Sequence, residues 1–521
     1  MNATDPPFEK ELMIRADSAC DAAADTAAHA LPGAKPSAPT SDMQGKPALF
    51  HSVQLDESLC VGCTTCIRFC PTKAIRVRSG KARISEDLCI DCGECIRRCP
   101  KGAKKAVSDP LFLLDGFDLR VALPAPSLYG QFSLHHSHAD IFKALHHIGF
   151  DEVFDVAWGA VEATRLTLKL IERAAALPVI SSACPVVVRL IQQRFPSLIP
   201  NLLSLLPPVE IAAIEARRLL SGFRGRIGVF FLSPCTAKVT AVRWPLGYQH
   251  SEVDAVFSLK DIYPSLKKAI EALSPDRPLS KGTAPAEGQN PDVPAHSPRS
   301  KDSYSLPYFN DLEPGLGWAR SDGELEALHI PDAVSVDGIS NVIDLLEAIE
   351  NGDIHSIRYI EALACPGGCV GGPMAVENPH LARSTMRQRC ERVQRSDLER
   401  PKALSPLQSA KALSPLQPAE ASSLTSLIKL DEEALRLYGW TIPLKPKPVR
   451  VLNHDLAKAL AMAEEIERIS ALLPGIDCGA CGAPDCQSLA EDIVRGLAVL
   501  EDCRIPRISN SDQSEPREEK P

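Results

Sequence analysis

The sequence has few of the features that mark nucleic-acid-binding, membrane or secreted proteins. Aromatic residues form only 5% of the chain and the formal net charge is −9, so we expect no stacking platform for bases and no nucleic-acid partner. No run of about 18 uncharged apolar residues occurs, which argues against a transmembrane helix. The N-terminal residues are charged and lack the apolar core of a secretory signal, so we expect a cytoplasmic protein without membrane insertion.

Cysteine is the residue in excess, with 18 in a chain of 521 residues. Many of these cysteines are closely spaced, and in a reducing cytoplasm such spacing indicates metal ligands instead of disulfides. Hydrophobic residues make up 45% of the chain, which is enough for several cores, and the length predicts three or more domains.

Composition predicts a multidomain protein of mixed α/β and α+β class. The expected parts are a disordered tail (1–50), a cysteine-rich domain (51–108), a two-lobed α/β domain (117–398), a linker (399–425), a small helical cysteine-containing domain (426–505) and a second disordered tail (506–521). Residues 274–307 are rich in Pro, Ser and Gly, so we expect a flexible insertion there. The linker contains KALSPLQ twice, a repeat too short for a solenoid.

The cysteine-rich domain holds two copies of the pattern C-x2-C-x2-C-x3-C-P. Three cysteines on one loop can wrap a cubane, whereas the fourth cannot fold back and binds the other cluster. One [4Fe-4S] cluster is therefore expected on Cys60, Cys63, Cys66 and Cys99, and a second on Cys89, Cys92, Cys95 and Cys70. The fold should be a ferredoxin-like β-α-β pair that transfers electrons; a zinc ribbon, the alternative, needs only two C-x2-C pairs.

Basic residues follow the second copy of this pattern. This stretch offers either a docking surface for an acidic redox partner or an ordinary solvated face, and it comprises Arg97, Arg98, Lys101, Lys104 and Lys105. We favour the solvated face.

Four further cysteines lie in three places in the α/β domain. Each follows an apolar stretch and adjoins Pro or Gly, which places Cys184, Cys235, Cys365 and Cys369 on loops at strand ends. Four thiolates converging from such loops can hold one cubane. The glycines around Cys369 would let the backbone approach a bulky cofactor closely.

These three segments resemble the signature motifs of the [FeFe]-hydrogenase large-subunit family, and the resemblance extends over about residues 51–505. It implies that the four cysteines ligate the cubane of an H-cluster and that Cys369 bridges to a two-iron subsite carrying CO and cyanide. Lys238 would hydrogen-bond a cyanide ligand, since a cationic donor suits an anion in a dry pocket. The alternative is that Lys238 is an ordinary surface lysine.

Several positions depart from the family motifs. Catalytic members carry a proton-relay cysteine where this chain has Ala183, and a methyl group cannot pass a proton. Ser233 and Leu363 replace methionines, and Ala241 replaces a glutamate. This pattern is similar to that of sensory members and predicts weak turnover. Ser181, Ser182 and Glu162 are candidate replacement relays, whereas the histidine-rich stretch 135–149 is expected to be a surface helix.

The last cysteines follow the pattern C-x2-C-x4-C-x16-C, comprising Cys478, Cys481, Cys486 and Cys503. Such spacing can surround a third [4Fe-4S] cluster and resembles the four-cysteine domain of certain redox-complex and corrinoid proteins, with zinc as the alternative. Cys20 and Cys390 stay unassigned.

Three functions follow from this reading. The first is a sensory hydrogenase with slow reversible H2 chemistry, a separate redox or signalling partner and dependence on hydrogenase maturation proteins. The second is a non-catalytic iron–sulfur electron carrier or scaffold without a two-iron subsite. The third is a hydrogen-turnover enzyme with an unusual proton route.

Overall fold

The computed structural model describes residues 50–273, 313–398, 424–447 and 451–505. The expected tails, the 274–307 insertion, the linker with its repeat and Cys20 lie outside these ranges. No helix in the described ranges has the length and apolar character needed to cross a membrane.

Residues 50–108 form the N-terminal domain, which has the expected ferredoxin-like β-α-β pair. Strand β1 (Val53–Leu55) pairs antiparallel with β4 (Lys104–Ala106), and β2 (Ile75–Arg78) pairs with β3 (Lys81–Ile84). The short helices α1 (Thr65–Arg68) and α2 (Glu94–Arg98) each begin inside a cysteine loop. Ser79 and Gly80 both have positive φ, as a tight two-residue hairpin requires.

The first lobe of the central domain is a four-stranded parallel sheet in the order β6-β5-β8-β9. Its strands are β5 (Leu119–Pro124), β6 (Glu152–Val153), β8 (Ile227–Ser233) and β9 (Ala255–Ser258). Strand β5 is buried along its whole length because helices cover both faces, which explains why Arg120 is its only polar residue. Helices α3 (His138–His147) and α8 (Leu259–Leu273) share one core with this sheet, and α6 (Pro208–Leu219) shares the other.

Helix α3 contains much of the histidine-rich stretch. It buries Ile141 and Leu145 in the core and leaves His146 and His147 exposed, as expected for a surface helix. A capping box formed by Ser137 and Asp140 fixes where this helix begins.

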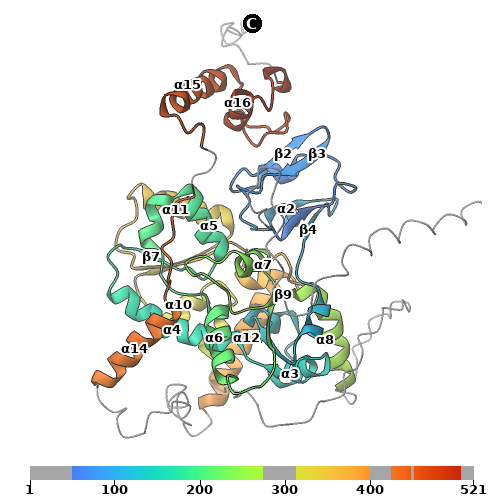
Figure 1. Ribbon diagram of the computed structural model, residues 1–521, viewed down its shortest axis with the longest axis vertical. Coiled ribbons are helices and arrows are strands. Elements are labelled where there is room, and N and C mark those ends of the chain that lie inside the picture. Colours follow the sequence, from blue (N-terminus) through green and yellow to red (C-terminus); the bar gives the residue numbers. More distant parts are fainter. Residues whose placement is uncertain (1–49, 274–312, 399–423, 448–450, 506–521) are drawn as a thin grey trace, which may run out of the picture. The chain divides into compact units, whose positions relative to one another are not determined.

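The second lobe is a three-stranded parallel sheet in the order β10-β11-β7. Figure 1 labels its strand β7 and its helices α5 and α11. It consists of β7 (Val179–Ile180), β10 (Ala333–Asp337) and β11 (Tyr359–Leu363). Helices α5 (Pro185–Arg194) and α11 (Ile339–Glu350) contribute to its core. The other helices of the two lobes are α4 (Val156–Glu172), α7 (Thr236–Arg243), α9 (Glu313–Gly317), α10 (Gly323–Leu328) and α12 (Pro379–Leu398).

Helix α14 (Leu424–Tyr438) and the residues that follow it belong to the central domain by their contacts. Asp431 pairs with Arg165 of α4, the Trp440 amide donates to the Ser204 carbonyl (3.1 Å), and the Lys447 amide donates to the Gln192 carbonyl (3.0 Å). Residues 431–447, which we expected in the domain at 426–505, thus contact the central domain. We call residues 451–505 the C-terminal module. Its helices are α15 (Leu456–Leu472) and α16 (Cys486–Val494).

Hydrogen bonds join the C-terminal module to the β2–β3 hairpin of the N-terminal domain. Asp492, at 2% exposure, accepts hydrogen bonds from Arg76 (2.7 Å) and Arg78 (2.9 Å). The Val77 amide donates to the Gly482 carbonyl (2.8 Å). Gly482 has φ +83°, and a Cβ there would lie 2.0 Å from the Val77 carbonyl oxygen, so only glycine suits this contact.

Candidate metal centres

The first cavity of the N-terminal domain, site A, is lined by Cys60, Cys63, Cys66 and Cys99. This is the grouping expected from the spacing, with the fourth cysteine supplied by the second copy of the motif. The Ala82 amide points at Cys60 Sγ (3.4 Å) and the Ala103 amide at Cys99 Sγ (3.2 Å). Such amide donors favour the thiolate form that an iron–sulfur cluster needs.

The second cavity, site B, is lined by Cys70, Cys89, Cys92 and Cys95. It repeats the arrangement of site A, because the Ala74 amide donates to Cys70 Sγ (3.2 Å) as the Ala103 amide does to Cys99. Burial raises the pKa of Cys95 to about 12. A buried thiol with so high a pKa stays protonated without a metal. Binding to a positively charged metal cluster would favour its thiolate form.

Two members of the basic stretch are not on a solvated face. Lys104 is only 3% exposed and lines site A, and within the described residues its Nζ has no hydrogen-bond partner. Its positive charge also lowers the pKa of Cys66 and Cys95, although burial raises both pKa values by more. Arg97 turns towards the central domain. Our expectation of a solvated face was therefore wrong for these two residues, because tertiary packing covers them.

The C-terminal module forms a third cavity, site C, lined by Cys478, Cys481, Cys486 and Cys503. Asp477 caps the loop by accepting the Cys486 amide (2.8 Å). Gly479 follows the first cysteine with φ +71° and packs against Ile67 of α1. Ile67 directly follows Cys66 of site A, and Gly479 directly follows Cys478 of site C. The contact between Ile67 and Gly479 therefore brings sites A and C close together.

The fourth group, site H, comprises Cys184, Cys235, Cys365 and Cys369. Cys184 follows β7 and caps α5, Cys235 follows β8 and caps α7, and Cys365 follows β11. The carboxyl ends of parallel strands therefore carry three of the four thiols, where α/β proteins commonly build sites. Burial raises the pKa of Cys369 to about 12 and also raises the pKa of Cys235, and the neighbouring thiols of site H add to both effects.

Glycine is required on both sides of Cys369. Gly368 has φ +91°, and a Cβ there would lie 2.6 Å from the Ser321 amide nitrogen. A Cβ on Gly371 would lie 2.1 Å from the Pro366 carbonyl oxygen. The chain therefore folds tightly around this thiol because side chains are missing, as a bulky buried group at site H would demand.

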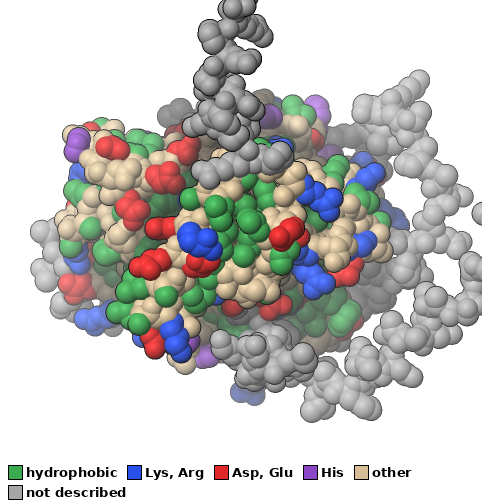
Figure 2. All heavy atoms as spheres, turned by 90° about the horizontal axis from the view of Figure 1, so that it is seen from above, with side chains coloured by type: hydrophobic (Ala, Val, Ile, Leu, Met, Phe, Trp, Pro, Cys, Tyr) green, Lys and Arg blue, Asp and Glu red, His purple; other side chains and the backbone are tan. Residues whose placement is uncertain are grey.

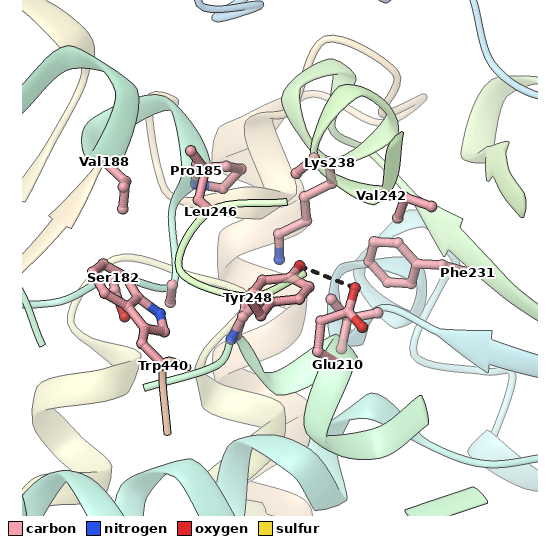
Figure 3. A pocket seen from close by; sticks show the side chains of 14 residues that line it. Ser182, Pro185, Val188, Glu210, Phe231, Lys238, Val242, Leu246, Tyr248 and Trp440 are labelled. Carbon is pink, nitrogen blue, oxygen red and sulfur yellow. Dashed lines mark hydrogen bonds between the residues drawn. The ribbon is translucent and has the colours of Figure 1, made fainter. Parts of the chain in front are cut away.

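A separate cavity adjoins site H (Figure 3). Its walls include Ala183, Phe231, Lys238, Tyr248 and Trp440, so the position of the missing thiol and the lysine line the same space. Lys238 Nζ lies 5.6 Å from the centre of the Phe231 ring, and its charge lowers the pKa of Cys369 against the larger effect of burial. Lys238 is thus not an ordinary surface lysine.

The size of this cavity can be compared with the three cysteine cavities. By the same measure of free volume it holds about 30 Å³, against about 20 Å³ at sites A and B and about 10 Å³ at site C. The cavity beside site H is therefore the largest of the four, and most of its lining is apolar. Its lining carries one cation, Lys238, which could contact an anionic group, and one buried acid, Glu210.

Three protein families match successive parts of the chain. Residues 52–100 match a 4Fe-4S dicluster domain, residues 119–373 match the iron only hydrogenase large subunit, C-terminal domain, and residues 473–505 match a putative Fe-S cluster family. The chain is therefore similar to hydrogenases over residues 119–373 and to iron–sulfur domains on either side. Residues 119–373 include all four cysteines of site H.

Curated relatives agree with this assignment. The chain is 28% identical over 258 residues to iron hydrogenase 1 of Clostridium pasteurianum, covering 44% of each protein. It is 24% identical over 350 residues to subunit HndD of the NADP-reducing hydrogenase of Solidesulfovibrio fructosivorans, covering 61% of this chain and 56% of that one. The chain is also 25% identical over 376 residues to the periplasmic [Fe] hydrogenase large subunit of Nitratidesulfovibrio vulgaris, covering 64% of this chain and 88% of that subunit. The chain spans about half the length of the first two relatives.

Solved hydrogenase structures resemble the chain more distantly. An [FeFe]-hydrogenase studied for oxygen inactivation of its H cluster has 16% identity and a TM-score of 0.40, and covers 63% of this chain and 95% of that one. A variant of the [FeFe]-hydrogenase HydA1 from Chlamydomonas reinhardtii has 20% identity and a TM-score of 0.34. The match covers 52% of this chain and 83% of that variant.

The candidate replacement relays of the hydrogenase-like domain occupy different environments. Ser182 lines the cavity but donates to the Leu205 carbonyl (3.0 Å). Ser181 donates to Glu324 instead, and Glu162 is held by Arg165 (2.5 Å). Of the other departures, Ala241 lines the cavity, Ser233 accepts the Cys235 amide, and Leu363 is buried at the end of β11.

Glu210 is a cavity residue that sequence reasoning missed. It is 2% exposed and accepts hydrogen bonds from Ser251 (2.5 Å), the Glu252 amide (3.0 Å) and Tyr248 (3.1 Å; Figure 3). Burial raises the pKa of Glu210. The only sequence signal is an acid in the otherwise apolar start of α6, which no motif marks.

Removing one thiol from site C provides a test of the metal assignment. We expect Cys481→Ser to lose about four iron atoms per chain, since a cubane held by three thiolates is labile, while sites A, B and H keep theirs. Iron and acid-labile sulfide analysis would measure the loss. The matched control is Cys390→Ser, a buried thiol of α12 far from these cavities in the chain, which should keep full iron content. Equal iron loss in both variants would contradict the assignment.

Proposed function

We propose that this hydrogenase-like protein is a sensory-type [FeFe]-hydrogenase that interconverts H2 with protons and electrons slowly and reversibly. The observation that carries the proposal is that Lys238 and Ala183 line one cavity beside site H. The lysine needed to hold the cofactor is present, whereas the thiol needed for fast proton transfer is replaced by a methyl group.

In this proposal site H holds a [4Fe-4S] cubane and the adjoining cavity holds a two-iron group with CO and cyanide ligands. When bound, that group supplies the metal chemistry that cleaves H2 into two protons and two electrons. Lys238 donates to an anionic ligand from a half-buried position, and the apolar wall formed by Phe231, Val242 and Leu246 excludes water.

Proton transfer is the step that the residues of this chain slow. A thiol has a pKa near 8.5 and exchanges protons near neutral pH, but the Ala183 side chain has no exchangeable proton. Ser182 donates its hydroxyl to a backbone carbonyl. A slow rate that still responds to H2 suits a detector better than a bulk catalyst.

Electrons would pass between site H and sites B, A and C in turn, in either direction because the proposed reaction is reversible. Three observations support this order. Arg97 of α2 donates to Cys365, and Gly479 packs on Ile67. Cys66 of site A lies near enough to Cys95 of site B to add to the rise in the Cys95 pKa that burial causes. Each transfer moves one electron between neighbouring clusters.

A separate redox or signalling protein would receive the signal at the C-terminal module. Several large apolar side chains remain exposed there, and hydrophobic atoms gather on the face seen in Figure 2. They are Leu456, Leu460, Leu472, Ile476, Leu497, Val499 and Leu500, of which Ile476 lies two residues before Cys478. Assembly of the two-iron group would also need hydrogenase maturation proteins.

An infrared spectrum of protein produced with the maturation machinery tests this function. We expect bands from metal-bound CO and cyanide, because the cavity and Lys238 suit such ligands. The matched control is Lys238→Met, which keeps the length of the side chain, loses the donor and should lose most of the bands. If the unaltered protein shows no bands despite full iron loading, the proposal of a sensory hydrogenase is wrong, and an electron carrier becomes the better assignment.

A further inference from the structure

Arg97 connects two of the predicted metal centres directly. It lies in α2, two residues after Cys95 of site B, and its side chain extends into the central domain. Its Nη2 donates to Cys365 Sγ of site H (3.0 Å) and to the Gly371 carbonyl (2.9 Å). Its Nη1 also donates to the Cys92 carbonyl of site B (3.3 Å).

Glu94 holds this arginine in place. It is 6% exposed and accepts a hydrogen bond from Arg97 Nη1 (2.7 Å). The guanidinium is planar, so fixing one edge on Glu94 aims the other edge at Cys365 and Gly371. The contact is therefore a built arrangement that uses both nitrogens, and a freely moving surface side chain would not hold it.

The neighbouring Arg98 shows the contrast. Its side chain is 52% exposed, reaches the same Glu94 only at 3.6 Å, and stacks on the Phe69 ring 4.4 Å away. Adjacent arginines on one helix thus have different roles: Arg98 covers the surface of the N-terminal domain, and Arg97 contacts a predicted ligand of site H.

We propose that Arg97 is a positioning residue that raises the reduction potential of the site H cubane and so draws one electron at a time from site B to site H. This inference rests on the cubane of the proposed function and is independent of the two-iron group. No bond forms or breaks and no proton moves: the reduced cluster at site B is oxidised and the cubane at site H is reduced.

The physical reason is the charge that reduction adds. A reduced cubane carries one more negative charge than the oxidised cubane, so a hydrogen bond from a buried cation to its thiolate stabilises the reduced form more. Arg97 meets site H at a ligand sulfur but meets site B only at a backbone carbonyl. The effect at site H therefore exceeds the effect at site B and increases the driving force between them.

The experiment measures the potential of the site H cubane in the full chain produced without maturation proteins, so that the two-iron group plays no part. An electron paramagnetic resonance signal that is absent from a Cys235→Ser variant identifies this cubane. In Arg97→Met we expect its potential to become more negative, so that the ratio of reduced to oxidised cubane at a fixed potential falls about tenfold, equivalent to about 59 mV for one electron.

Two further variants separate a redox effect from a structural one. Arg97→Lys keeps the positive charge and should recover part of the potential, whereas Arg97→Gln keeps a donor without the charge and should recover less. Arg98→Met is the matched control and should leave the potential unchanged. If Arg97→Met assembles poorly, the comparison of the Lys and Gln variants gives the same answer.

The outcomes are distinguishable. One outcome is that Arg97→Met and Arg97→Gln both retain the signal that depends on Cys235 and show an unchanged potential. That outcome would overturn the role of Arg97 and leave the proposed function intact. Absence of any signal dependent on Cys235 would overturn both. An equal shift in Arg98→Met would show a general surface-charge effect and would also overturn the inference.

Discussion

Replacing Ala183 by cysteine is expected to increase the rate of H2 oxidation about 100-fold. Ala183 lines the cavity beside site H, so a thiol there meets the space proposed for the two-iron group. Proton transfer by a positioned side chain contributes about 10²- to 10⁴-fold to a rate. We expect the lower end of that range because the new thiol would lack a free group to pass its proton to. Glu162 accepts a hydrogen bond from Arg165, and the Ser182 hydroxyl donates to the Leu205 carbonyl.

The measurement is H2-driven reduction of a viologen dye, with infrared band intensities used to normalise the amount of two-iron group. The matched control is Ala183→Ser, which adds a group of similar size whose hydroxyl does not ionise near neutral pH. We expect that control to raise the rate only slightly. An unchanged rate in Ala183→Cys at equal cofactor content would show that proton transfer does not limit this protein, and would remove the reason for assigning it to the sensory type.

Replacing Asp492 by alanine is expected to separate the C-terminal module from the N-terminal domain. Asp492 is nearly fully buried between Arg76 and Arg78, and removing one partner of a buried charge network costs about 3–5 kcal/mol. The amide of Val77 donates to Gly482 across the same contact, so its hydrogen should exchange much faster in the variant. Hydrogen-exchange mass spectrometry of the peptides containing β2, β3 and α16 measures this.

The control for this change is Glu465→Ala. Glu465 pairs with Arg468 on the exposed surface of α15, where water and salt screen the pair, so exchange at the hairpin should stay the same. Equal protection of the hairpin in Asp492→Ala and the unaltered protein would show that other contacts hold the module. Separation of the module should also slow electron transfer between site A and site C, since Gly479 packs on Ile67 in the same interface.

The grouping of the cysteines could be predicted because it depends on local geometry. Three thiols on one short loop can reach one cluster and the fourth cannot, so the spacing alone places Cys99 with Cys60 and Cys70 with Cys89. The structure brings together the same four-residue sets. The parallel sheets were also predictable, because the apolar sequence of β8 has no polar alternation.

Residues whose roles depend on contacts between distant segments were not predictable. A run of basic residues after a cysteine motif suggests a solvated face, and only the docking of two domains shows that Arg97 reaches Cys365. Glu210 and Tyr248 come from separate elements, and no spacing rule joins them. The contact between α14 and α4 was not predictable for the same reason, since α14 has the amphipathic pattern of any surface helix and its partner in α4 is far away in the chain.

Trp440 has a consequence for how this protein could evolve or be divided. It lines the cavity beside site H, although it lies 67 residues beyond the end of the segment at 119–373 that matches the hydrogenase family. Its amide bonds to Ser204, and Gly439 bridges to Leu205. A fragment cut at the family limits would therefore have an incomplete wall beside Lys238, and recombination that exchanged the C-terminal part would alter the site along with the electron path. The cavity and the C-terminal part must therefore be inherited together.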